Sequence, residues 1–208
     1  MPNEKDNKRF WNRSAAFYDA SRRPDSPAYD AVISRIRARL TPEMNVLELA
    51  TGTGIIALRT ADCCRTIEAT DFSEEMIRVA KSKAAPENVT FAVADATALP
   101  YADGRFDAVI ISNALHIMPN PQKALENIRR VLRDGGILFA PTYLRTRSFG
   151  EKIKVLIGAV IGFKTYSKWT KAEYLAFLAQ NGWEVLTCEV FSATFPLAYV
   201  TAVKKEAE

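Results

Sequence analysis

Residues 46–54 constrain the fold of this chain more than any other stretch. Residues 46–50 read VLELA, an apolar run with one acid, and Thr51-Gly52-Thr53-Gly54 follows. A helical pattern begins directly afterwards, so the stretch predicts a strand, a tight turn and the start of a helix. The two glycines permit turn angles that other residues resist, and they let the backbone approach a ligand closely. The first helical turn offers unpaired N–H groups to that ligand.

Two kinds of ligand fit this turn. The series Gly52-x-Gly54-x-x-Ala57 satisfies the loose dinucleotide fingerprint, which allows alanine in last place. A carboxylate at the strand's end, Glu48, instead suits a cationic or hydroxyl-rich ligand such as S-adenosylmethionine. The glycine pattern alone does not decide between them, and an ordinary strand-to-helix turn would show it too.

The bulk composition predicts a single globular domain. The chain has 208 residues, a net charge of +4 and 48% hydrophobic residues, which is enough for one full core. Much of the basic character lies at the ends and in one late segment, so the charge does not indicate nucleic-acid binding. Three cysteines, two of them adjacent, argue against a disulfide framework and favour the cytoplasm. We read no signal peptide in the polar first residues and no apolar run of membrane-spanning length.

Strands and helices alternate from residue 45 to residue 141. Strands are predicted at residues 45–49, 65–71, 89–93, 106–111 and 137–140. This alternation predicts a doubly wound, mostly parallel α/β sheet, whose ligands bind outside the carboxyl ends of the strands. Four polar residues follow or end consecutive strands: Glu48, Asp71, Asp95 and Asn113. We therefore expect a ligand site at this edge of the sheet.

The N-terminal residues are expected to cover that edge. Residues 1–9 are predicted to be disordered. Trp11, Ala15 and Tyr18 then recur at helical spacing and share one face. We interpret residues 10–40 as a helical flap over the ligand pocket, with plain packing helices as the alternative.

The residues after the alternating part are expected to cover the substrate. Residues 143–168 combine an apolar run with flanking lysines and arginines and predict a lid on the substrate side. Contact of residues 152–168 with a membrane surface is the alternative. Thr170 opens a capped helix, and strands at 183–190 and 194–203 are expected to pair as an antiparallel hairpin.

Six motifs, in order, give the chain a family resemblance. They are Asn12-x-x-Ala15-x-x-Tyr18-Asp19, Val46-Leu47-Glu48-Leu49-Ala50-x-Gly52-x-Gly54, Asp71-x-Ser73-x-x-Met76, Asp95-Ala96-x-x-Leu99-Pro100, Phe106-Asp107 and Arg130-Val131-Leu132-Arg133-x-Gly135-Gly136. With them, residues 10–141 resemble a class I S-adenosylmethionine-dependent methyltransferase of the small-molecule type, close to those of ubiquinone and menaquinone biosynthesis. The resemblance implies a Rossmann-like, seven-stranded sheet with an antiparallel last strand, in a single domain over residues 1–208. The quinone-pathway enzymes are longer and carry further C-terminal motifs that we do not find here, which leaves the substrate open.

The resemblance also implies roles for residues near the methionine part of S-adenosylmethionine. Gly52 and Gly54, with Ala50 beside them, would lie against it. Glu48 would stand near its amino group or support the loop. Tyr18 in the flap would close over the cofactor.

A second set of residues is implied for the nucleoside part. Asp71 would hold the ribose hydroxyls. Phe72 and Met76 would flank the adenine. Asp95 would reach the adenine amine, and Ala96 would supply a backbone contact.

The resemblance places Asn113 near the reacting methyl, and the residues suggest how the reaction is helped. Methyl transfer from a sulfonium is an in-line displacement that depends on positioning and water exclusion. His116, the only histidine, is a candidate general base toward a phenol, enol or thiol. Its alternative is a loop histidine that shapes the pocket or caps the next helix.

The predicted function is methylation of a small apolar, aromatic or lipid-like acceptor, with no metal and no nucleic-acid partner. Two other classes stay open. An NAD(P)-dependent oxidoreductase would share the glycine loop, but we find neither a tyrosine–lysine pair nor a second substrate domain. A non-catalytic cofactor-binding protein of the same fold would keep all the pocket motifs.

Overall fold

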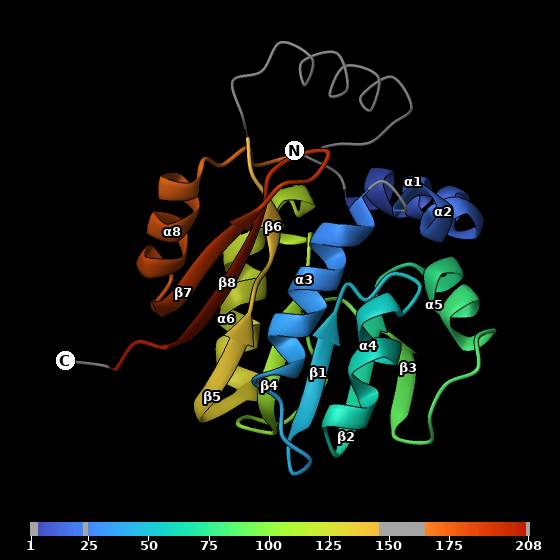
Figure 1. The fold of residues 1–208 in the computed structure, drawn as a ribbon, viewed down its shortest axis with the longest axis horizontal. Coiled ribbons are helices and arrows are strands. Elements are labelled where there is room, and N and C mark those ends of the chain that lie inside the picture. The colour runs from blue at the N-terminus through green and yellow to red at the C-terminus, as the bar shows by residue number, and fades with distance from the viewer. Residues whose placement is uncertain (1–3, 23–24, 146–164, 207–208) are drawn as a thin grey trace.

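The protein is described by a computed structural model, which covers residues 4–22, 25–145 and 165–206. A mostly parallel sheet forms its centre (Figure 1). In spatial order the first five strands are β3 (Val89–Val93), β2 (Thr66–Asp71), β1 (Asn45–Leu49), β4 (Phe106–Ile111) and β5 (Leu132–Phe139). The chain moves outward from β1 to one side and then returns to β4 on the other. The sheet therefore has a topological switch point between β1 and β4, as the doubly wound prediction requires.

The last strand of the chain joins the sheet in the reversed direction. β8 (Leu197–Lys204) pairs antiparallel with β5, and β7 (Trp183–Phe191) pairs antiparallel with β8. The short strand β6 (Thr142–Tyr143) also pairs with β8. Phe139 lies opposite Thr201 and Thr142 opposite Ala198, so β5 and β6 share one register. Pro141, which has no N–H group, stands at the break between them. The predicted seven-stranded sheet is confirmed, with β6 as a continuation of β5.

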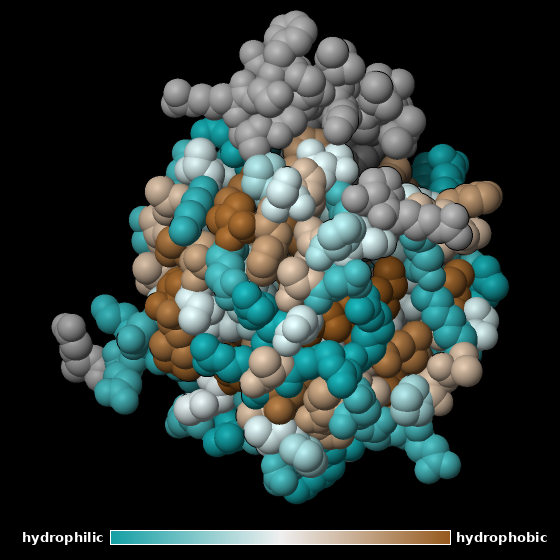
Figure 2. Space-filling view, in the orientation of Figure 1, coloured by the Kyte–Doolittle hydropathy of each residue, from teal (hydrophilic) through white to brown (hydrophobic). Residues whose placement is uncertain are grey.

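Helices cover both faces of the sheet. One face packs against α3 (Ser26–Arg37), α4 (Ile55–Thr60) and α5 (Glu74–Lys81). The other face packs against α6 (Pro121–Val131) and α8 (Lys171–Gln180). We call these the α3 side and the α6 side. On the side that Figure 2 shows, hydrophilic residues surround scattered apolar ones, as is usual for a globular surface.

Most predicted helix starts are confirmed in atomic detail. Ser73 caps α5 because its Oγ accepts a hydrogen bond from Met76 N at 3.2 Å. Thr170 and Glu173 form the predicted capping box of α8.

The N-terminal helices are α1 (Glu4–Ser14) and α2 (Tyr18–Arg22), with the 3₁₀ turn η1 (Ala15–Phe17) between them. Two further 3₁₀ turns are η3 (Ala61–Cys63) and η4 (Leu115–Ile117).

Two local predictions were wrong. Residues 4–9, expected to be disordered, lie in α1. β5 begins at Leu132 rather than at Ile137, because residues 134–136 form a bulge within the strand. The N-cap residue of α3 is Asp25.

The predicted substrate lid falls mostly outside the described residues. Residues 146–164 are not described, so the lid and the membrane contact at residues 152–168 stay predictions. Of the helices in the described part of the chain, none combines the length and apolar character that crossing a membrane requires.

Candidate active site

The loop between β1 and α4 has the conformation that its glycines predict. Gly52 and Gly54 have φ angles of +57° and +80°. A Cβ atom at Gly54 would stand 2.7 Å from ring atoms of Phe91, so this position needs glycine for space as well as for its backbone angle. Gly54 is also the N-cap residue of α4, which places the first N–H groups of that helix behind the loop.

Two residues that are not glycine also adopt left-handed backbone conformations. Ala50 follows β1 with φ +52°, and Asn113 follows β4 with φ +53°. In the described ranges no other non-glycine residue has positive φ. Such strain persists only where the surrounding structure enforces it, and it concentrates at functional sites. Both residues belong to the predicted site, although the strain at Ala50 has no signal in the sequence.

Glu48 lies beneath the loop rather than in the open. Its side chain is buried, and Thr51 donates a hydrogen bond to Oε2 at 2.8 Å. Burial raises the pKa of Glu48 to about 8, against hydrogen bonds from Thr51 and from the backbone of Ala57; the nearby Asp71 carboxylate raises it further. Of the two positions expected for Glu48, this geometry matches the one that supports the loop.

Asp71, the last residue of β2, joins the same loop. Its Oδ2 accepts a hydrogen bond from Gly52 N and its Oδ1 accepts one from Ser73 N, both at 2.9 Å. Burial raises the pKa of Asp71 to about 6, although these backbone hydrogen bonds favour the carboxylate. A carboxylate accepts about four hydrogen bonds, so acceptor capacity remains for ligand hydroxyls.

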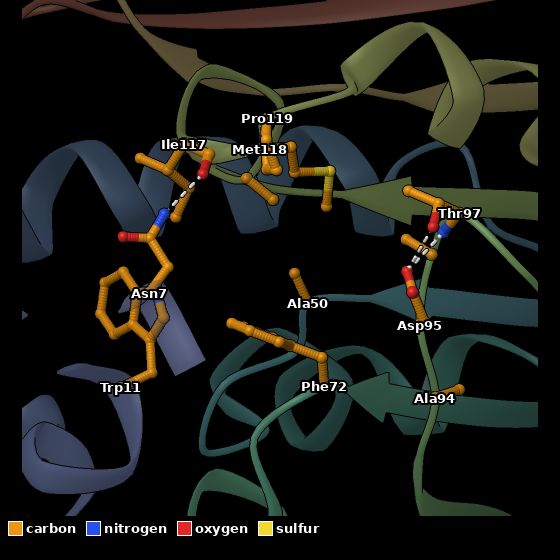
Figure 3. A pocket seen from close by; sticks show the side chains of 12 residues that line it. Asn7, Trp11, Ala50, Phe72, Ala94, Asp95, Thr97, Ile117, Met118 and Pro119 are labelled. Atoms are coloured by element: carbon orange, nitrogen blue, oxygen red, sulfur yellow. Dashed lines mark hydrogen bonds between the residues drawn. The ribbon is translucent and has the colours of Figure 1, made fainter. Parts of the chain in front are cut away.

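A cavity lies at the carboxyl ends of β1, β3 and β4, beside α1 (Figure 3). Its volume is about 90 Å³, which is below the roughly 300–1,000 Å³ of whole small-molecule sites, so it would take only part of a ligand. Asp95 stands at one end, where Thr97 donates two hydrogen bonds to its Oδ1, each of 2.8 Å. The cavity is lined by Asn7, Trp11, Ala50, Phe72, Ala94, Asp95, Ala96, Thr97, Ala114, Ile117, Met118 and Pro119.

Sequence reasoning found part of this lining and missed the rest. Ala50, Phe72, Asp95 and Ala96 come together as predicted site residues. Met76 is fully buried in the first turn of α5 and does not line the cavity. The residues that were not predicted as site residues come from α1, from the segment after β3 and from the segment between Ala114 and Pro119. The signals in the sequence are that Trp11 shares the flap face with Tyr18 and that the other two segments follow predicted strands.

The N-terminal helices contact the glycine loop. The ring of Tyr18 lies so close to Gly52 that a Cβ atom there would be 3.3 Å from Tyr18 Cε1. Asp19 accepts a hydrogen bond from the hydroxyl of Thr53 and forms an ion pair of 2.7 Å with Lys83. In turn, Lys83 Nζ donates to the carbonyl of Thr53 at 2.8 Å. The helices thus hold the loop that a ligand would contact.

His116 lies in η4, on a buried turn at the end of β4. Its Nδ1 is 3.1 Å from Thr142 Oγ1, and its ring stands edge-on to that of Tyr143 with centroids 6.3 Å apart. Burial lowers the pKa of His116 to about 4, so the imidazole is neutral at neutral pH. Neither His116 nor Asn113 lines the cavity of Figure 3. The role of His116 as a base stays a prediction.

Within residues 4–22, 25–145 and 165–206, no group of three or more histidine, cysteine, aspartate or glutamate side chains is arranged to hold a metal ion.

Comparison with known sequences gives a consistent family. Residues 47–140 match a family model described as "Methyltransferase domain". A demethylmenaquinone methyltransferase of Renibacterium salmoninarum is 42% identical over 97 residues, which are 47% of this chain and 40% of that protein. The ubiquinone/menaquinone biosynthesis C-methyltransferase UbiE of Bdellovibrio bacteriovorus is 33% identical over 155 residues, 73% of this chain and 63% of the relative. This chain therefore spans less than two thirds of the length of either relative.

Solved structures share the fold over nearly the whole chain. The DhpI–SAH complex has a TM-score of 0.76 at 23% identity and covers 98% of this chain and 97% of that one. The methyltransferase in complex with the Haloferax volcanii activator Trm112 has a TM-score of 0.77 at 20% identity, covering 99% and 100%. At such identities the likeness establishes the fold, and the predicted Rossmann-like methyltransferase fold is confirmed.

Proposed function

We propose that this chain, whose residues 47–140 match a methyltransferase-domain family model, transfers the methyl group of S-adenosylmethionine to a small, apolar or aromatic acceptor. One observation carries the proposal. The strained glycine loop, the buried Asp71 and the cavity beside Phe72 all lie at the carboxyl ends of strands around the switch point of the sheet. Transfer to oxygen, sulfur, nitrogen or carbon would suit this site.

The residues present fit the nucleoside part of S-adenosylmethionine. Asp71 is fixed by two backbone N–H groups and keeps acceptor capacity for the ribose hydroxyls. Phe72 and several alanines line an apolar cavity suited to adenine. Only one oxygen of Asp95 accepts from Thr97, so the other is available to the adenine amine, while Ala96 offers its backbone.

The charges favour this cofactor over a dinucleotide. The carboxyl groups of Glu48 and Asp71 both lie against the glycine loop, where a bound cation would favour their ionised forms and a pyrophosphate would oppose ionisation. When bound, S-adenosylmethionine supplies a methyl group already activated by its sulfonium. The oxidoreductase alternative is therefore not favoured.

The flap would exclude water from the methionine end. Tyr18 lies over Gly52, and Asp19 ties α2 to Thr53 and Lys83. A closed, positioned site is the main catalytic need of an in-line displacement. Asn113 would stand near the reacting methyl.

His116 is the proposed base for acceptors that hold their proton at neutral pH. Its imidazole is neutral, which is the form that takes up a proton, and its contact with Thr142 through Nδ1 leaves Nε2 for that purpose. The lowered pKa makes it a weak base, which suits a phenol or thiol whose proton is transferred as the acceptor reacts.

We also infer a cytoplasmic, small-molecule setting. The three cysteines are free thiols, as in a reducing compartment. The named quinone-methylating relatives support an acceptor of apolar, aromatic character.

A transfer assay tests the proposed function. Purified protein is incubated with methyl-labelled S-adenosylmethionine and a panel of apolar phenols, quinols, thiols and indoles. We expect label in at least one acceptor with wild-type protein and none with heat-unfolded protein. Cofactor binding without transfer to any acceptor would instead favour the non-catalytic alternative.

A further inference from the structure

One polar atom at the end of β4 is buried and has no hydrogen-bond partner among the described residues. It is Oδ1 of Asn113, the residue that also holds a left-handed backbone conformation. Nearly all buried polar atoms of native proteins are hydrogen-bonded, so an unpaired one needs an explanation. A ligand that donates a hydrogen bond would provide it.

The rest of Asn113 is held firmly. Its backbone N donates to the carbonyl of Pro141 at 2.8 Å. Its Nδ2 donates to the hydroxyl of Tyr29 at 3.0 Å and lies 3.5 Å from Ser112 Oγ. These contacts fix the backbone and the amide plane, and they leave one carbonyl oxygen as a preorganised acceptor.

The side chain of Asn113 belongs to the α3 side of the sheet. Its partner Tyr29 packs in the α3-side core. The cavity of Figure 3 is lined instead by Ala114 and Met118, which pack with the α6-side core. Asn113 is not among the residues that line this cavity. We therefore infer that the Asn113 amide contacts a part of the ligand site other than the proposed adenine cavity.

A second such atom belongs to a residue that bonds to η4. The hydroxyl of Tyr166 is buried without a partner in the part of the chain that the structure describes, and Tyr166 N donates to the carbonyl of His116 at 3.0 Å. The nearby buried carboxylate is already satisfied, because Asp25 accepts from Tyr143 at 2.6 Å and from Thr194 N at 2.7 Å. The groups shown to contact Asn113 are thus neutral: the carbonyl of Pro141 and the hydroxyls of Tyr29 and Ser112.

We propose that Asn113 Oδ1 accepts a hydrogen bond from an O–H or N–H group of an uncharged aromatic acceptor, and that Tyr29 is the positioning residue that orients this amide. The inference rests on the proposed function and narrows its substrate class. It assigns the Asn113 side chain to the acceptor rather than to the cofactor.

Matched probes test this assignment. Protein saturated with S-adenosylhomocysteine is titrated by NMR with naphthol against methoxynaphthalene, and with indole against N-methylindole. Each pair differs by one hydrogen-bond donor. We expect wild-type protein to bind at least one donor-bearing member at least tenfold more tightly than its methylated match.

Three variants separate the roles. Asn113→Gly keeps a residue that tolerates positive φ but removes the amide, so the preference should vanish. Tyr29→Phe removes only the phenol oxygen and should reduce the preference severalfold, with unchanged melting temperature and S-adenosylhomocysteine affinity. Tyr199→Phe, in another buried tyrosine of the α3-side core, should leave the preference intact.

The possible failures are distinct. Equal binding of matched probes, or no binding of any probe, would overturn the role of Asn113. A tenfold loss of S-adenosylhomocysteine affinity in Asn113→Gly would assign this amide to the cofactor instead. If wild-type protein fails to bind S-adenosylhomocysteine at all, the proposed function itself fails.

Discussion

Glu48 and Asp71 bring two carboxyl groups to one buried loop. Each is desolvated, and each is held by hydrogen bonds from that loop. Desolvation makes each carboxyl group keep its proton to a higher pH than it would in water. The stability of the protein should therefore depend on pH through these groups.

Glu48→Gln isolates one of them. The pKa of Glu48 is raised from 4.5 to about 8 on folding, so between these values the folded state binds more protons than the unfolded state. The free energy of unfolding of wild-type protein must then fall relative to Glu48→Gln as pH rises through this window. Urea denaturation at about pH 5 and about pH 8 measures the free energy of unfolding of wild-type protein and of Glu48→Gln. A constant difference between the two proteins would show that Glu48 has no raised pKa.

His116→Gln tests the proposed base. Glutamine keeps an atom able to bond Thr142 but cannot take up the acceptor's proton. We expect unchanged S-adenosylhomocysteine affinity and a fall in turnover of roughly a hundredfold, the low end for general-base catalysis. In wild-type protein the acidic limb of the rate profile should lie near pH 4 rather than near 6.5. Unchanged turnover in the variant would remove His116 from the mechanism.

Gly54→Ala tests the close packing of the glycine loop, with Gly135→Ala as its matched control. Both glycines have positive φ, +80° and +71°, so alanine strains the backbone at both. Only at Gly54 would the new Cβ meet Phe91, at 2.7 Å, because nothing lies within 4 Å at Gly135. Chemical denaturation should show Gly54→Ala less stable than Gly135→Ala by about 1–3 kcal/mol, the cost of overpacking. Equal losses would mean that Phe91 simply moves aside.

At the scale of elements, the N-terminal helices are part of the site. α1 supplies Asn7 and Trp11 to the cavity, and the rings of Trp11 and Tyr18 meet edge-on with centroids 5.9 Å apart. The predicted shared face of Trp11 and Tyr18 is thus confirmed. We expect the flap to be ordered further when the cofactor binds.

Hydrogen exchange tests this coupling. S-adenosylhomocysteine should slow amide exchange across α1 and α2 of wild-type protein. Asp19→Asn weakens the ion pair with Lys83, so it should reduce this protection and lower affinity up to about fivefold, as an exposed pair allows. Asp30→Asn, which weakens an equally long 2.7 Å pair between α3 and Arg59, outside α1 and α2, should change neither. If S-adenosylhomocysteine leaves amide exchange in α1 and α2 unchanged, these helices do not close over the cofactor.

The elements that sequence could predict are those with local signals. Apolar runs mark β1 and β4, and Ser73 and Thr170 mark helix starts through their own side chains. The start of β5 at Leu132 has no such signal, because it pairs with Phe106 only across a bulge. β6 exists only because β8 lies beside it.

The site residues that could be predicted from the sequence are likewise those with local signals. Asp71 and Asp95 were predictable because strand ends in a parallel sheet share one edge. Asn7 and Met118 were not, since they reach the cavity through the packing of α1 and of the turn after η4. The burial of Glu48 depends equally on the packed loop above it.

At the scale of the whole molecule, the two faces of the sheet have different neighbours at its carboxyl edge. The α6 side carries alanines and Met118 that border the proposed adenine site, and the α3 side carries Tyr29 beside Asn113. The glycine loop lies between the two. One sheet edge therefore carries the cavity on its α6 side and Asn113 on its α3 side, as separate places for cofactor and acceptor would require.

Calorimetric titration tests the central claim most directly. S-adenosylhomocysteine and NADH are titrated in parallel into wild-type protein, Asp71→Asn, and Asp134→Asn as a surface control whose partner is Lys204. The account predicts that S-adenosylhomocysteine binds and NADH does not, that Asp71→Asn weakens binding at least tenfold, and that Asp134→Asn does not. Binding of NADH alone, or unchanged affinity in a folded Asp71→Asn, would contradict it.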